Sequence, residues 1–191
     1  MASVIADHPP QELAAELSAL LRVDWRTVWP GIPDGEAERT EWCAAFGWEP
    51  LWLQSGLWVR TPLGGRLHLA SAPGPGRPVT RASYTVWQAT AAAEAEGEAV
   101  LAVALDRYAA HLDRMSAALG APGGWGDAEE RGPESSAPYR TARWRYANPL
   151  APVIVLDLDH RVGGYAGGGT ISLAFHGPAD PNPDNGPGWL L

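Results

Sequence analysis

The sequence predicts an α+β fold: a single antiparallel sheet of about six strands with helices packed mainly on one face. The length of 191 residues is near that of one ordinary domain. Hydrophobic residues make up 46% and charged residues 19%, which is close to the average of globular proteins. Helical and strand-like patterns then follow in the order helix, helix, three or four strands, long helix and three strands, an order that suits this architecture and argues against a doubly wound nucleotide-binding fold.

Two helices are expected before the first strands. Four leucines recur at helical spacing and predict a helix over residues 11–23. A second, shorter helix is expected to begin at the acidic turn after Asp34 and to end at Gly47, which offers the left-handed conformation that stops helices. Trp48, next in the chain, is expected to fold back onto the last turn of this helix.

The clearest helical pattern lies between the glutamates near residue 96 and Gly120. Acidic residues at its start and basic residues later complement the helix dipole, and Gly120 ends it. Six apolar residues recur every three or four positions and predict one continuous buried stripe: Leu101, Leu105, Tyr108, Leu112, Met115 and Leu119.

The remaining patterns are strand-like. Alternation or β-rich composition predicts strands over residues 51–53, 57–61, 66–70, 79–90, 140–146, 153–159 and 170–176. The last two are expected to direct inward Ile154, Leu156, Leu158, Ile171, Leu173 and Phe175. Gly- and Pro-rich stretches predict an exposed loop at 72–78 and a flexible connection at 123–138. We therefore expect one domain over residues 1–176 and a Pro/Asp-rich tail over 177–191.

Charge and cysteine content restrict the partners and the compartment. The 14 arginines and 22 acidic residues give a net charge of −8, which disfavours nucleic acid and anionic membranes and favours a basic protein as partner. The only cysteine, Cys43, excludes an intramolecular disulfide, and we expect it to be a small buried hydrophobe. No long apolar window and no signal-peptide pattern occur, so a cytoplasmic location is expected.

Known chemical motifs are absent from the sequence, and no cofactor is expected. The glycine-rich segment 163–169 leads into a strand instead of a helix, so it predicts a hairpin loop and not a phosphate-binding loop. No nucleophile elbow and no helical metal-binding motif occur. His8, His68 and His111 are isolated, and each is expected to be structural or solvated.

Asp157 and Asp159 share one face of a predicted strand, with His160 next in the chain and His176 on a later strand. A metal site is one interpretation of these four residues. We favour the interpretation that charged residues occupy the outer face of a half-exposed strand. An enzyme with an unrecognised site at Asp157, Asp159 and His176 stays open as a third hypothesis on function.

Tryptophan and arginine occur together on two predicted strands. Trp58 lies two residues from Arg60, and Arg143 and Arg145 flank Trp144. Such pairs are typical of interface anchors and also of ordinary stacking on a sheet surface. The candidate partner-binding residues are Trp58, Arg60, Arg143, Arg145, Asp157 and Asp159.

Four short strings carry a family resemblance: Ala45-Phe46-Gly47-Trp48, Met115-Ser116-Ala117-Ala118-Leu119-Gly120, Ala142-Arg143-Trp144-Arg145 and Val153-Ile154-Val155-Leu156. Together with the order of elements over about residues 11–176, they resemble small actinobacterial domain families of unknown function. Some of these look like immunity proteins encoded beside polymorphic toxins. The resemblance implies a toxin as partner and assigns no functional residue, while the loop at 72–78 and the long tail depart from it.

The leading functional hypothesis is a non-enzymatic immunity protein that masks a basic toxin domain with an acidic, tryptophan-containing surface. The second is a chaperone or assembly adaptor of a secretion or phage-like particle, which uses the tail and Trp189-Leu190-Leu191 as a docking motif. Deletion of the tail is expected to separate these two hypotheses.

Overall fold

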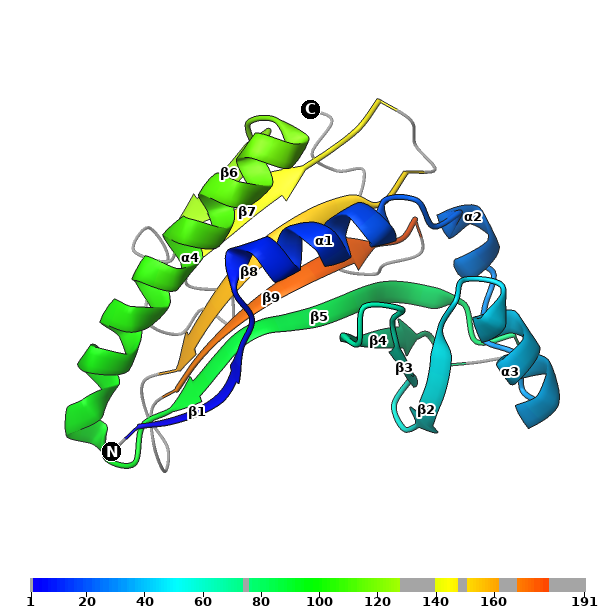
Figure 1. Cartoon of the computed structure of the whole chain (residues 1–191), viewed down its shortest axis with the longest axis horizontal. Coiled ribbons are helices and arrows are strands. Elements are labelled where there is room, and N and C mark those ends of the chain that lie inside the picture. The colour runs from blue at the N-terminus through cyan, green and yellow to red at the C-terminus, as the bar shows by residue number, and fades with distance from the viewer. Residues whose placement is uncertain (1, 74–75, 128–139, 148–150, 162–167, 179–191) are drawn as a thin grey trace. The chain divides into compact units, whose positions relative to one another are not determined.

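The computed structural model describes residues 2–73, 76–127, 140–147, 151–161 and 168–178. It confirms a mixed α+β fold in which helices accompany one antiparallel sheet (Figure 1). The described residues form nine strands, more than the six or so expected. Their order in the sheet is β2-β3-β4-β5-β9-β8-β7-β6, and β1 pairs separately with β5.

The chain begins with β1 (Ser3–Asp7), which pairs with the second half of β5 and was not expected from the sequence. The helix α1 (Pro10–Leu20) follows, with proline at its first position, where the missing N–H is no loss. Three of the four leucines of its stripe are buried, but the helix ends at Leu20, so Leu21 lies beyond it and is exposed.

Two short helices follow. α2 (Trp25–Val28) was missed by the sequence patterns because it is a single turn, capped by the Asp24 side chain. α3 (Glu36–Ala44) begins two residues after Asp34, and its N-terminal Gly35 makes no side-chain cap. As expected, Gly47 has a positive φ of 70° and the Trp48 N–H donates back to the Cys43 carbonyl oxygen.

The next four strands form a consecutive antiparallel series: β2 (Glu49–Leu53), β3 (Leu57–Arg60), β4 (Arg66–Ser71) and β5 (Val79–Thr90). The hairpin between β3 and β4 is confirmed. In the loop expected at 72–78, residues 74 and 75 lie outside the described residues. Alternate residues face the core, which buries Leu57, Val59, Leu67 and Leu69 completely.

The long helix α4 (Gly97–Leu119) follows a 3-10 turn at Glu94–Glu96 and ends at Gly120, whose φ is 85°. Its buried stripe is displaced from the expected one. The buried residues are Gly97, Val100, Ala104, Tyr108, His111 and Met115, whereas Leu101, Leu105, Leu112 and Leu119 are only half-buried. Tyr108 and Met115 belong to both sets.

Four strands complete the sheet: β6 (Gly124–Asp127), β7 (Arg140–Trp144), β8 (Val153–Arg161) and β9 (Gly168–His176). β6 lies in the segment expected to be a flexible connection, where it pairs with β7. The inward residues expected on β8 and β9 are all buried. β7 ends two residues early, so Tyr146 lies outside it and is 44% exposed.

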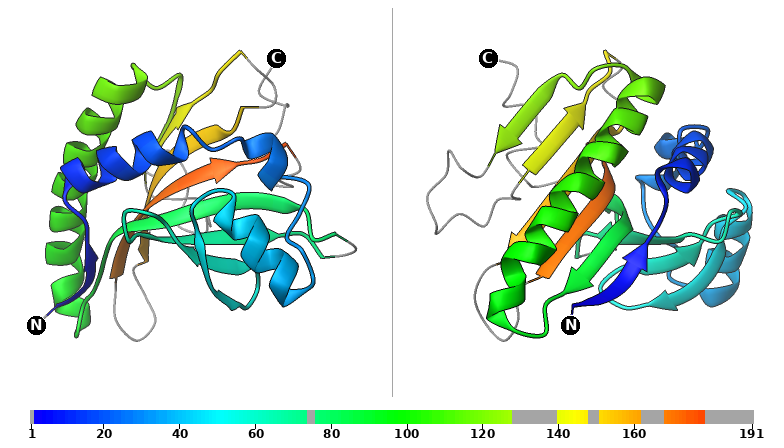
Figure 2. Two further views of the ribbon diagram at one scale, coloured as in Figure 1. Left: turned by 45° about the vertical axis from the view of Figure 1, so that its right-hand side comes forward. Right: turned by 60° about the vertical axis from the view of Figure 1, so that its left-hand side comes forward.

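Contacts divide the chain into two compact units. The first contains Met1–Ala15, Thr85–Trp144 and Val155–Leu173. In it α4 lies along β7 and β8 (Figure 2), and the Tyr108 hydroxyl donates to the Leu156 carbonyl oxygen.

The second unit contains Glu16–Tyr84, Arg145–Ile154 and Ala174–Leu191. Its core holds a stack in which the Trp25 ring lies 4.8 Å from the Trp29 ring and 5.0 Å from the Phe175 ring. The expectation of a single domain over residues 1–176 stays a prediction. Most of the expected tail, from residue 179 onward, lies outside the described residues.

Candidate functional site

A row of aromatic side chains crosses the strands β2, β3 and β4 in the second unit. The register places Trp52 opposite Trp58, and Trp58 opposite His68. Their rings stack with centroids 5.6 Å apart for Trp52 and Trp58 and 4.7 Å apart for Trp58 and His68, each pair inclined by 28°. Cross-strand aromatic pairs of this kind hold both rings in fixed positions.

This row faces away from the buried leucines and valine of β3 and β4. Trp52 is 43% exposed and its neighbour Leu53 is 38% exposed, while Trp58 and His68 are half-buried. Two ordered indole rings with accessible apolar surface next to an exposed leucine form a patch that water solvates poorly.

Arginines surround the aromatic row. Arg60 donates to the Glu49 carboxylate at 2.6 Å across β2 and β3, and Arg66 lies with its guanidinium carbon 5.9 Å from the Trp52 ring centre. Arg60 and Arg66 occupy opposing positions on β3 and β4. We call Trp52, Trp58, His68, Arg60 and Arg66 together the aromatic–arginine face. It has more positive than negative charge.

His68 belongs to this face as a neutral ring. Burial lowers the pKa of His68 below its ordinary value, and Arg81 lowers it further, although a backbone hydrogen bond at Ser55 opposes both effects. The uncharged imidazole therefore stacks on Trp58 at neutral pH without adding another cation to the face.

The candidate residues chosen from the sequence do not form one cluster. Trp58 and Arg60 lie together on the aromatic–arginine face, as their alternation indicates. Arg143 is half-buried on β7, and Arg145 is exposed just after that strand. Trp144 between them is buried, and its indole N–H donates to the Gly120 carbonyl oxygen at 2.8 Å, so it secures the end of α4 and offers no exposed anchor.

Asp157 and Asp159 share one face of β8, where Asp157 is half-buried and Asp159 is exposed. His160 follows on the same strand, and His176 is buried at the end of β9, in the part of the chain assigned to the second unit. Within the described residues, no group of three or more His, Cys, Asp or Glu side chains is arranged to hold a metal ion.

Two residues of interest were missed in the sequence. Trp52 lies in a short strand without visible alternation, and a register shift between Pro50 and Trp52 decides which side chain opposes Trp58. Glu16 lies inside the apolar stripe of α1, between Leu13 and Leu17, and is buried there. A carboxylate on the apolar face of a helix is a readable signal of a special environment.

In comparisons with known proteins, no family model, curated protein or solved structure matches this chain. The resemblance to immunity-protein families therefore stays a prediction. Among the residues that the structure describes, no helix is both long and apolar enough to cross a membrane.

Proposed function

We propose that this chain is a non-enzymatic protein-binding domain whose contact surface is the aromatic–arginine face. The observation that carries the proposal is the stacked pair of the exposed Trp52 and the half-buried Trp58, with Arg66 beside Trp52. Tryptophan and arginine are the residues most enriched at the energetic centres of protein interfaces. Because stacking already orders the two rings, their side chains lose little conformational entropy when a partner covers them.

The specific form that we propose is an immunity protein for a basic toxin domain. The net charge of −8 supports a basic partner. The negative charge does not come from the aromatic–arginine face itself. In the second unit, exposed carboxylates lie on α3, at Glu36, Glu38 and Glu41. The overall charge would steer a basic partner during association, and the tryptophans would hold it after contact.

The test is to co-express the chain with the product of the neighbouring gene and to measure both complex formation and toxin activity. Changing Trp52 and Trp58 together to Ala should weaken the complex by roughly a hundredfold, which is the size of a hot-spot loss. Tyr146→Ala, a change at a similarly exposed aromatic residue outside this face, should leave affinity within about twofold of the wild type. Wild-type affinity in the double variant would contradict the proposal, as would the absence of binding to the neighbouring product.

Truncation of the C-terminal tail distinguishes the alternative, an assembly adaptor, from an immunity protein. Contacts of Gly177 indicate where the truncation should begin. The Gly177 N–H donates to the Thr80 carbonyl oxygen at 2.8 Å, and the Gly177 backbone packs directly on the Trp29 ring. A deletion should therefore remove residues 179–191 and retain Gly177. Full binding by this truncated chain is expected for the immunity protein, whereas loss of binding would favour the adaptor.

A further inference from the structure

A hollow of about 690 Å³ lies in the second unit. It is bounded by the end of α1, the turn of α2, the last part of α3 and the connection from β3 to β4. Its volume falls within the usual range of small-molecule sites. None of the residues of the aromatic–arginine face lines it, so it is a separate feature that the proposed function does not use.

The buried carboxylate of Glu16 lines this hollow. Only 3% of the residue is exposed. Its Oε1 atom accepts a hydrogen bond of 2.6 Å from the Thr61 hydroxyl and one of 3.1 Å from the Gly65 N–H. Its Oε2 atom is shielded from water and has no hydrogen-bond partner among the described residues. Half of the hydrogen-bonding capacity of a buried carboxylate is thus unused, which is energetically costly.

The contacts of Glu16 depend on a special backbone position. A Cβ atom at Gly65 would lie 2.5 Å from Glu16 Oε1 and 2.5 Å from the Tyr84 ring, so only glycine lets this N–H approach the carboxylate. The Gly65 N–H also donates to the Thr61 hydroxyl oxygen at 3.0 Å. The two partners hold one carboxylate oxygen in a fixed orientation and leave the second for another donor.

Aromatic rings form a wall of the same hollow. Trp42, Phe46 and Trp48 line it, with ring centroids 5.2 Å apart for Trp42 and Phe46 and 4.7 Å apart for Phe46 and Trp48. Trp42 and Phe46 are half-buried, and Trp48 is buried. Indole and phenyl faces attract both flat apolar groups and cations.

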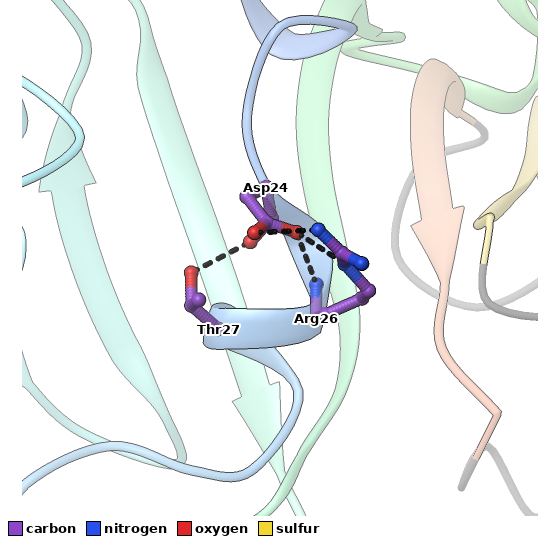
Figure 3. A network of polar contacts seen from close by, with 3 residues as sticks. All are labelled: Asp24, Arg26 and Thr27. Atoms are coloured by element: carbon purple, nitrogen blue, oxygen red, sulfur yellow. Dashed lines mark hydrogen bonds and ion pairs between the residues drawn. The ribbon is translucent and has the colours of Figure 1, made fainter.

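The other charges of the lining are either paired or exposed. Asp24 receives two bonds from the Arg26 guanidinium, at 2.9 and 3.1 Å, and a third from the Arg26 backbone N–H (Figure 3). The Arg26 side chain is the main cause that lowers the pKa of Asp24. Arg22 lines the hollow from an exposed position, where water screens its charge. Glu16 therefore remains the one buried charge of the described lining without a cationic partner.

We infer that the hollow binds a small organic cation that carries a primary ammonium group on a flat aromatic body. The ammonium group donates to Glu16 Oε2 and completes the hydrogen bonding of the carboxylate. Because this oxygen is shielded from water, the bond requires a small shift of the Glu16 side chain toward the hollow. The aromatic body lies against Trp42, Phe46 and Trp48. The site thus selects its ligand by one buried charge and an aromatic wall, the two features that favour desolvated organic cations.

Tryptamine and tryptophol provide a test with the intact chain, because they share the ring and the two-carbon linker and differ in an ammonium or a hydroxyl group. Isothermal titration should give an affinity for tryptamine at least about tenfold higher than for tryptophol, since the ammonium is charged and the hydroxyl is not. Equal affinities, or no binding of tryptamine at millimolar concentration, would overturn the inference.

Variants locate the site. Glu16→Gln should abolish the preference for tryptamine, whereas Glu41→Gln, which removes the same charge from an exposed position on α3, should retain it. Trp42→Leu keeps an apolar side chain but removes a π face, and it should reduce tryptamine affinity several-fold. If the Glu16 variant does not fold, the Trp42 variant decides: unchanged tryptamine affinity in that variant would contradict the proposed site.

Discussion

Gly56, in the turn between β2 and β3, lies so close to Leu69 on β4 that a methyl group at its Cα would overlap the Leu69 carbonyl oxygen. The same methyl group would lie 2.8 Å from Nε2 of His68, the last ring of the aromatic row. The φ angle of Gly56 is 129°, which side-chain-bearing residues rarely adopt. The tight turn therefore holds β2 against the strands that carry Trp58 and His68.

We expect Gly56→Ala to lower the free energy of unfolding by about 3 kcal/mol, because steric overlap adds to backbone strain. Gly64→Ala is the matched control: Gly64 also has a positive φ, of 89°, but nothing lies within 4 Å of the position that an added methyl group would take there. It should cost about 1 kcal/mol. Urea unfolding followed by circular dichroism measures both, and equal losses would show that the close approach to Leu69 is unimportant.

His111 makes the stability of the first unit depend on pH. It is completely buried on α4, and neither ring nitrogen has a hydrogen-bond partner among the described residues. Burial is the main cause that lowers the pKa of His111 to about 4, with smaller contributions from Arg107 and His8, while Asp7 opposes them. Between pH 6.5, the ordinary pKa of histidine, and about pH 4, His111 binds a proton in the unfolded chain but not in the folded chain. The free energy of unfolding should therefore fall as pH is lowered through this window.

Protonation of His111 in the unfolded chain should lower the free energy of unfolding by at most about 3 kcal/mol at the acidic end of this pH window. The pKa of His68 is also lowered, so His68 contributes with the same sign. The measurement is therefore a comparison of urea unfolding at several pH values between variants. His111→Met should flatten the pH dependence relative to the wild type. An unchanged slope in His111→Met would contradict the assignment.

Local patterns in the sequence correctly predict those strands in which the alternation of apolar residues matches the residues that are buried. β5 begins at Val79 and ends at Thr90, as expected, and the inward residues of β8 and β9 were identified correctly. β1 and β6 were missed because each is short, and the pairing of β1 with β5 and of β6 with β7 leaves no local pattern in the sequence. Gly124 and Gly126 within β6 have low intrinsic strand propensity, so the sequence there indicates a loop.

Helix α4 shows a limit of the apolar pattern. Two stripes run along it at helical spacing, one rich in leucine and one that includes Gly97, Ala104 and His111. The second is buried, and the leucines lie at its margins. The small residues allow a close approach of the helix, which hydrophobicity alone does not reveal. For the candidate site, the alternation of Trp58 and Arg60 was readable, but the position of Trp52 depends on a cross-strand register that the sequence does not encode locally.

Cys43 should be chemically inert in the folded protein. It is completely buried, as expected, and burial raises the pKa of its thiol to about 11 although Arg39 nearby opposes this. Because the thiolate is the reactive form, a disulfide reagent at pH 8 should react with Cys43 only after unfolding. Ala44→Cys introduces a thiol at the adjacent exposed position and should react at once in the folded state. Fast labelling of the native wild-type chain would contradict the burial of Cys43.

Trp25 couples the end of α1 to the core of the second unit. Its indole N–H donates to the Leu20 carbonyl oxygen at 3.0 Å, which satisfies an acceptor that the helix end leaves without an intrahelical partner. Trp25→Phe keeps an aromatic ring for stacking but loses this bond and part of the volume, so it should lower the free energy of unfolding by about 2 kcal/mol. Trp58→Phe is the same change at a half-buried position on the sheet surface and should cost less than about 1 kcal/mol. Denaturant unfolding of both variants tests the contrast, and a larger loss at Trp58 would mean that the aromatic–arginine face, not the Trp25 stack, dominates the stability of this unit.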